Sequence, residues 1–274
     1  ANSASEASIL SATSATNETF RLTGNCDIDG DLFMTNPDGY ASLTGNVTVG
    51  GVSASDPAIA EHIHIGVPDA PFPEVDPSVF APFATCLVDS GTSTSGNKTF
   101  NNIRIKAGTN PTFSGNIQLN GVIFIETPNR VHFSGNVTLK GVIVTEDAGD
   151  DVYDTNTIKF TGNMTARGVE ELPDTPEFHD LRQMPGSFLL APGFGVEFTG
   201  NFGTVGGTMA ADSYKFTGNA GGIVKGSVIC YSDSDFKLTG NSSLTIDRSG
   251  NPETPPGFSL PPTFTMTVST YQEY

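Results

Sequence analysis

Two histidines are the first residues of this 274-residue chain whose spacing suits metal chemistry. His62 and His64 alternate in the run Glu61-His-Ile-His64, so on a strand both imidazoles would lie on one face. Such a pair binds a transition metal when a third ligand comes from elsewhere in the chain. Two histidines alone are a weak signal, and the simpler interpretation is a surface strand that holds no metal.

Acidic residues gather in two turns that could bind calcium, which prefers several hard oxygen ligands at close range. Neither turn matches the EF-hand loop or the glycine-rich nonapeptide repeat, so solvated acidic turns are the simpler interpretation. We therefore expect no resident cofactor, with calcium as the one candidate. The candidate ligands are Asp27, Asp29 and Asp31 in the first turn and Asp147, Asp150 and Asp151 in the second.

Cleavage of a polysaccharide would need carboxylates facing a groove, or calcium beside a basic residue that takes a proton. The basic residues here are few and have no acidic partner motif. The chain also has no tryptophan, which removes the commonest platform for stacking a sugar ring. The sequence therefore predicts a protein that is not an enzyme, with a carbohydrate-binding or polysaccharide-cleaving protein as the alternative.

A repeat would position these residues. Eight times an apolar residue, a serine or threonine, a glycine and an asparagine follow one another, usually about 20 residues apart. Glycine tolerates positive φ and asparagine comes next, so the pair suits a tight corner between two short strands. A unit of this length is typical of one coil of a solenoid. The copies begin at Leu22, Leu43, Phe113, Phe133, Phe160, Phe198, Phe216 and Leu238.

Stacked coils of this kind predict an all-β fold, a parallel β-helix. The general rule for parallel crossovers favours a right-handed one. The phenylalanine or leucine before each corner would stack in the interior, and the asparagines would form a buried ladder of amides bonded from coil to coil. The predicted ladder residues are Asn25, Asn46, Asn116, Asn136, Asn163, Asn201, Asn219 and Asn241, with a weaker copy of the motif at Ser95-Gly-Asn97.

A serine or threonine precedes every motif glycine, which raises a third function. A regular column of hydroxyl residues can order water and bind ice, but such surfaces usually have paired columns on a flat face. The chemistry of the corner is the simpler explanation of the column. Ice binding would reveal itself as thermal hysteresis.

The remaining chain divides around the predicted stack. We expect a helical or irregular lead-in over 1–19, the β-helix over 20–249 with inserts at 52–94 and 170–195, and a Pro-rich tail over 250–274. Proline cannot serve a central ladder, so the first insert should cross or cap the solenoid. In the second insert, Thr175-Pro-Glu predicts the start of a helix of about two turns that ends at Pro185.

The tail ends in a run with the pattern of a half-buried strand. Phe264, Met266 and Val268 alternate with threonines there. The simpler interpretation is that this strand caps an edge of its own molecule. The alternative is that it pairs with a neighbouring copy of the chain, which would make these three residues the assembly residues of a homopolymer.

The composition fits an extracellular or cell-surface protein. The 30 acidic and 13 basic residues give a net charge of −17, which repels nucleic acid and anionic membranes. No segment approaches the roughly 18 apolar residues of a membrane span, so we expect no direct membrane insertion. The small polar residues from Ala1 onward would also suit a chain that follows a removed segment.

Three cysteines form an odd set. Cys26 and Cys86 could pair in an oxidising compartment, although nothing in the sequence brings them together. Cys230 stands in the apolar run Val228-Ile-Cys and is expected to point into the core as a small hydrophobic side chain.

From about residue 94 to 258, the chain resembles a group of bacterial surface proteins, found especially in planctomycetes. These carry a pilin-like N-terminal helix followed by a Gly-Asn-repeat β-helix. The resemblance implies an exported structural or assembly role, subunit of a surface filament, sheath or layer, with pilus-related assembly and no catalytic residues. The segments that carry it are Phe113-Ser-Gly-Asn-Ile-Gln-Leu-Asn-Gly-Val-Ile-Phe-Ile, Leu172-Pro-Asp-Thr-Pro-Glu-Phe, Phe216-Thr-Gly-Asn-Ala-Gly-Gly and Ile246-Asp-Arg-Ser-Gly.

Overall fold

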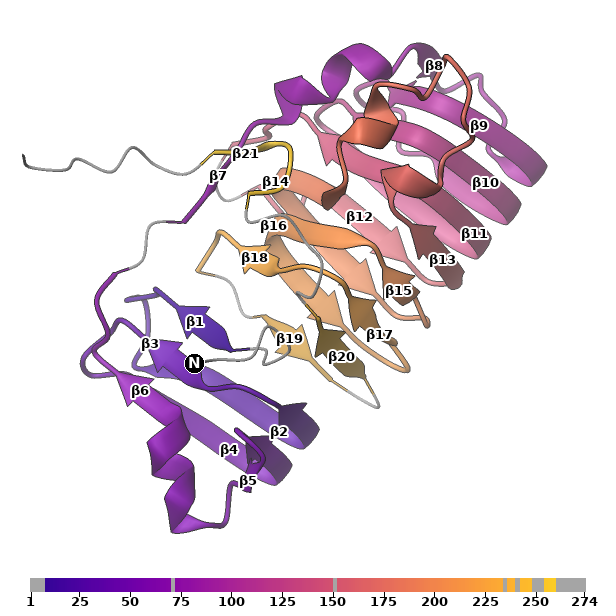
Figure 1. Cartoon of the computed structure of the whole chain (residues 1–274). Helices are drawn as coiled ribbons and strands as arrows, with labels where there is room; N and C mark the ends of the chain where they lie inside the picture. The colour runs from indigo at the N-terminus through magenta and orange to yellow at the C-terminus, as the bar shows by residue number, and fades with distance from the viewer. Residues whose placement is uncertain are drawn as a thin grey trace, which may run out of the picture.

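The chain winds into a β-solenoid of about 11 turns (Figure 1). The computed structural model describes residues 8–69, 72–149, 152–233, 236–239, 242–247 and 254–259. Their parallel stacked strands confirm the predicted all-β parallel β-helix. The right-handed winding stays a prediction. None of the helices in the described ranges has the length and apolarity needed to cross a membrane.

The largest sheet forms the main stack, and all its strand pairs are parallel. Its order is β18 (Val228–Cys230), β16 (Gly207–Phe216), β14 (Gly186–Phe198), β12 (Thr157–Phe160), β11 (Arg130–Thr145), β10 (Thr112–Ile125), β9 (Ser95–Ile105) and β8 (Cys86–Val88). Two further strands join it, β13 (Asn163–Arg167) on β11 and β19 (Lys237–Leu238) on β16. Beside it lies a sheet of β15 (Gly203–Val205), β17 (Gly221–Val224) and β20 (Ser243–Ile246).

A column of phenylalanine rings fills the interior of the main stack. Successive ring centroids lie 5.2, 4.9, 4.8 and 5.2 Å apart, and each pair of rings is within 16° of parallel. Burial of such rings dominates the energetics of a core, and the offset stacking of aromatic pairs adds to it. The predicted interior aromatics are thereby confirmed for Phe113, Phe133, Phe160, Phe198 and Phe216.

Glycine is required at the corners because neighbouring rungs approach there too closely for a side chain. Gly135 has φ +105, and a Cβ on it would lie 2.6 Å from the carbonyl oxygen of Gly115. The second glycine of the repeat is required for the same reason, since a Cβ on Gly141 would collide with the carbonyl of Gly121. Both glycines of the repeat are therefore fixed by contact between rungs as well as by backbone conformation.

The first coils form two small sheets of their own. These sheets are β1 (Ile9–Ser11), β3 (Leu32–Met34) and β6 (Ile63–Ile65), and β2 (Glu18–Ile28), β4 (Tyr40–Val49) and β5 (Val52–Ser53). The expectation of a helical or irregular lead-in is wrong at β1, because those residues pair with β3. Figure 1 shows these sheets far from β9, at the opposite end of the molecule.

The two inserts cover one outer face of the main stack. On that face Val122 and Phe124 of β10 and Val142 and Val144 of β11 point away from the phenylalanine column and are still buried. The side chains that cover them include Phe80 and Ala84 of the first insert and Leu172, Phe178 and Leu181 of the second. The residues around Phe80 thus lie across the solenoid, one of the two positions expected for the first insert, whereas β6 and β8 of the same predicted insert pair with strands of the coils.

Short 3₁₀ helices replace the longer helix expected in the second insert. Residues 176–180 form turns, followed by η5 (Leu181–Gln183). The physical reason is that Phe178 and Leu181 both anchor on the stack while the Arg182 guanidinium donates to the carbonyl of Leu172. The remaining elements are η1 (Pro57–His62), β7 (Glu74–Val75), η2 (Pro77–Val79), η3 (Ala81–Phe83), η4 (Val169–Glu171) and β21 (Phe258–Ser259), which pairs antiparallel with β7.

Candidate functional site

Asp31 joins the two histidines that the sequence singled out. It lies just before β3, and its carboxylate oxygens lie 2.8 Å from His62 Nδ1 and 2.9 Å from His64 Nε2. His62 ends η1, and His64 lies on β6 with its ring stacked on Phe33 at 4.6 Å between centroids. Hydrogen bonds from His62 and then His64 lower the pKa of the Asp31 carboxyl, because they favour its charged form.

We call the contact of Asp31 with His62 and His64 the Asp31 clasp, and its surroundings indicate a structural contact. Gly50 leaves the space that the His62 ring fills, since a Cβ on Gly50 would collide with that ring. The clasp ties η1 and β6, which follow the second coil, to the turn before β3. Within the described part of the chain, no group of three or more histidine, cysteine or acidic side chains is arranged to hold a metal ion.

The structure does not gather the first candidate calcium cluster. Asp27 accepts a hydrogen bond from the Thr48 hydroxyl, whereas Asp31 is engaged by the two histidines, and Asp29 is exposed. In the second cluster, Asp147 accepts a hydrogen bond from the Gly149 N–H at 2.8 Å. Positions 150 and 151 lie outside the described residues, so calcium at that turn stays a prediction.

The predicted asparagine ladder is confirmed over two stretches. In each, the side-chain Nδ2 of one rung donates to the Oδ1 of the preceding rung. The ladder ends at Asn201, whose Oδ1 instead accepts from the Gly203 N–H at 2.8 Å. Asn219 lies in a turn, and Asn241 falls outside the described residues. The bonded pairs are Asn46–Asn25 at 3.0 Å, Asn116–Asn97 at 2.9 Å, Asn136–Asn116 at 3.1 Å and Asn163–Asn136 at 3.4 Å.

The ladder is exposed, which corrects the expectation that its amides are buried. Asn97, Asn116, Asn136 and Asn163 all lie at the surface. The reason is the corner itself. The positive φ of the preceding glycine turns the asparagine outward, while the phenylalanine before it and the apolar residue after it point into the core.

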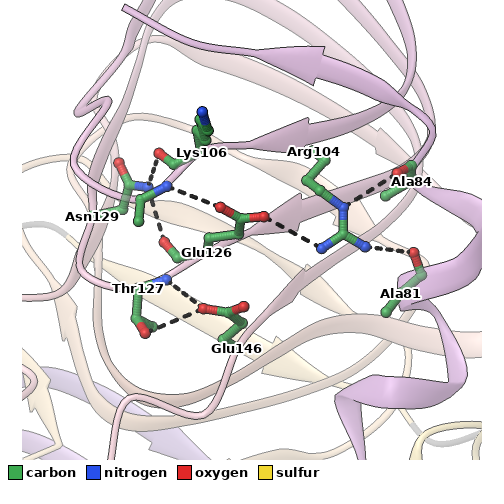
Figure 2. A network of polar contacts seen from close by, with 9 residues as sticks. Ala81, Ala84, Arg104, Lys106, Glu126, Thr127, Asn129 and Glu146 are labelled. Atoms are coloured by element: carbon green, nitrogen blue, oxygen red, sulfur yellow. Dashed lines mark hydrogen bonds and ion pairs between the residues drawn. The ribbon is translucent and has the colours of Figure 1, made fainter.

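A polar network holds the first insert against the stack (Figure 2). Arg104 on β9 donates from Nη2 to the Ala81 carbonyl at 2.8 Å and from Nε to the Ala84 carbonyl at 3.4 Å. Its guanidinium also lies 3.5 Å from the Glu126 carboxylate and 4.4 Å from the centroid of the Phe124 ring. One side chain therefore joins two rungs and the insert.

The same network continues through the turns that connect the rungs (Figure 2). The Asn129 side chain donates to the carbonyls of Lys106 at 2.8 Å and Glu126 at 2.9 Å. The Glu146 carboxylate accepts from the Thr127 N–H at 2.8 Å. The Glu126 and Glu146 carboxylates accept hydrogen bonds from backbone N–H groups, and Glu126 also pairs with the Arg104 guanidinium. These contacts stabilise the turns.

Acidic partners for basic residues come from neighbouring rungs, which sequence reasoning missed. Besides Arg104 with Glu126, Lys159 lies 3.0 Å from Glu197 on the next rung. Stacking brings residues far apart in the sequence to about 4.8 Å. The signal was present in the spacing of the repeat, because Lys159 and Glu197 stand at the same position before their motif glycines.

Lys98 is a second residue that the sequence analysis missed. It pairs in register with Ile117, and the next rungs place Val137 and Met164 there, all of them core residues. The Lys98 Nζ donates to the Ser93 carbonyl at 2.7 Å. A charge at an inward position of the last rung is a known protection of sheet edges.

All three cysteines are free. Cys26 on β2 and Cys86 on β8 belong to different sheets and form no disulfide. Cys230 is half-buried and packs against the main core, as expected. Burial raises the pKa of the Cys26 thiol and raises that of Cys230 to about 11, so both are thiols at neutral pH and poor nucleophiles.

Comparison with known proteins gives no relative for this chain. No family model matches it, and no curated protein and no solved structure matches it.

Proposed function

We propose that this chain is a non-enzymatic structural protein of the cell surface, the subunit of a filament, sheath or layer. The observation that supports this most is the pile of hydrogen-bonded rungs around one continuous column of phenylalanines. In a solenoid each unit contacts only its neighbours, so such a body is a stiff, elongated building block.

Charge and resemblance add support for a surface location. The net charge of −17 keeps a protein soluble outside the cell and disfavours nucleic acid as a partner. The resemblance to bacterial surface proteins with a Gly-Asn-repeat β-helix implies export and pilus-related assembly.

Copies would meet through the C-terminal run of the chain. The strand stack carries features at both ends that oppose simple end-to-end pairing. Lys98 points inward on the last rung at β9, and β5 folds back on Thr48 and Val49 of β4. We therefore assign the assembly contact to Phe264, Met266 and Val268, which lie outside the described residues.

Electron microscopy and sedimentation of the full chain at rising concentration test this proposal. We expect ordered assemblies, and we expect them to disappear when residues 263–274 are deleted. A matched variant keeps the length of the chain and replaces Phe264, Met266 and Val268 by threonine. It should lose assembly as the deletion does, because the run would then have no large apolar side chains to bury.

Two results would contradict the proposal. One is a full chain that stays monomeric at every concentration, with and without calcium. The other is the release of reducing ends or unsaturated sugars from a polysaccharide incubated with the protein, which would favour the cleaving enzyme.

A further inference from the structure

The inserts leave one side of the main stack bare. They cover the segment that follows the second glycine of each rung, where Val122 and Phe124 point outward. The preceding segment, between the corner asparagine and the second glycine, presents polar side chains instead. We call it the amide face. On β9, β10, β11 and β13 it consists of the columns Asn97, Asn116, Asn136, Asn163 and Thr99, Gln118, Thr138, Thr165, bordered by the column Asn101, Asn120, Lys140, Arg167, in which Asn120 is buried.

The amide face is a regular lattice because its rungs are in register. Thr99 pairs with Gln118, Gln118 with Thr138 and Thr138 with Thr165. Rungs lie about 4.8 Å apart and alternate residues of a strand about 6.7 Å apart, so the four rungs span about 14 Å along the solenoid axis. Thr99, Gln118 and Thr165 are exposed, and Thr138 is half-buried.

Much of the hydrogen-bonding capacity of this face is unused. Each rung of the ladder spends one N–H of its asparagine on the rung before it, which leaves the second N–H of that amide. Among the described residues, the Gln118 amide donates to Asn120 and the Asn120 amide donates to Asn101, whereas the hydroxyls of Thr99, Thr138 and Thr165 form no hydrogen bond. Unused asparagine N–H groups and unused threonine hydroxyls therefore repeat from rung to rung.

Charge narrows the class of ligand. None of the three columns contains an acidic residue, although the whole chain carries 30. The two cations, Lys140 and Arg167, lie together at one edge of the lattice, and Arg167 is 3.6 Å from Glu171. The face itself is close to neutral, while the net charge of −17 elsewhere repels a polyanion.

Shape excludes a small ligand, because small molecules bind in concave sites and this lattice is the outer side of a sheet. A long, uncharged molecule with hydroxyls at regular intervals matches both the neutrality and the repeat. We propose that the amide face binds a linear neutral polysaccharide that runs along the solenoid axis. The proposal does not rest on assembly of the protein, since one copy carries the whole lattice.

The amide face has no aromatic side chain on which a sugar ring could stack, so its affinity should depend on the length of the polysaccharide. A hydrogen bond at an exposed site gains little because it replaces one with water. Several such bonds along one chain act together, because each bound sugar holds the next near its rung. Affinity should therefore rise steeply between short oligosaccharides and chains long enough to cover four rungs.

Affinity electrophoresis of the full chain in gels that contain a soluble linear β-glucan tests the proposal. We expect retardation that grows with the length of the glucan fraction, and little retardation by polygalacturonate. The triple variant Thr99→Val, Thr138→Val, Thr165→Val removes three hydroxyls while keeping β-branched residues on the strands. It should bind the longest fraction at least tenfold more weakly than the natural chain.

The matched control places the same change on another side of the solenoid. Thr217→Val and Thr239→Val alter two corner threonines away from the amide face and should leave binding unchanged. Equal circular dichroism and melting temperature would show that all variants fold. The proposal is overturned if no glucan fraction retards the chain, if the triple variant binds as the natural chain does, or if polygalacturonate binds as well as glucan.

Discussion

At the scale of single residues, the close spacing of the rungs depends on the lack of a side chain at the motif glycines. The motif glycines stack on one another so closely that a Cβ on Gly135 or Gly115 would lie 2.6 Å from the carbonyl oxygen of the preceding glycine. Real Cβ atoms are not found at such distances, so the backbone would have to move. The corner glycines therefore serve contact between rungs, and positive φ is only part of their role.

Substitution of Gly135 by alanine separates these two effects. We expect a loss of more than about 2 kcal/mol in the free energy of unfolding, from the clash together with the left-handed conformation. Gly149 is the matched control, because it has φ +82 and nothing near the position of a Cβ. Gly149→Ala should cost only the conformational part, about 1 kcal/mol. Denaturant titration of both variants measures the difference, and equal losses would contradict the clash.

At the scale of elements, side chains fasten irregular segments to regular coils. Arg104 holds the first insert by two carbonyls of residues 81 and 84, and Asp31 holds η1 and β6 by two imidazoles. In both cases one side chain makes several bonds to the irregular segment, and β6 is in addition paired with β3 through the backbone. These fastenings differ in their response to pH, because a guanidinium does not titrate in proteins and a carboxyl does.

Acid should open the Asp31 clasp. The folded pKa of Asp31 is below its usual value of 3.8, so the clasp contributes stability above that value. This contribution is lost as the pH falls through the lower folded pKa, when the carboxyl takes a proton. We expect the protection of the β6 amides from hydrogen exchange, relative to the intrinsic rate at each pH, to fall below about pH 4. In Asp31→Asn that fall should be absent, and the same acid response in both proteins would contradict the assignment.

At the scale of the whole molecule, the main stack ends at β9 in a charged rung. Lys98 occupies the column that Ile117, Val137 and Met164 continue, so the last rung presents an ammonium group where the others present a core side chain. β8 adds a strand beyond β9 only along Ile103–Ile105. The remainder of that edge relies on charge to prevent pairing with another copy.

Lys98→Ile should cause copies of the chain to associate through the β9 end. The substitution extends the apolar column to the surface and removes the protecting charge, so we expect association at concentrations at which the natural chain is monomeric. Sedimentation velocity measures the change. Lys106→Ile, a change on an exposed turn of the same rung, is the control and should stay as the natural chain. Equal association of both variants would indicate non-specific hydrophobic association and would contradict pairing through the β9 end.

The sequence by itself determined the coil. A repeated corner with an aromatic before it carries enough local information, because corner conformation, inward alternation and rung length are set within one unit. It also predicted the ladder from Asn116 through Asn163 and the crossing of the stack by the residues around Phe80. It went wrong at β1 and over the expected helix in the second insert, which lack the repeat, and it went wrong within the repeat on the burial of the ladder amides, which are exposed.

Only the tertiary structure decided which side chains meet across the stack. The bonds of Asp31 to His62 and His64, of Arg104 to Glu126 and of Lys159 to Glu197 join residues separated by about one coil or more. The number of residues between two rungs varies with each insert, so spacing alone does not tell which partner lies above which. The same holds for the amide face, whose exposure was settled by where the inserts fold, since they bury one outer side of the coil and leave the next one in water.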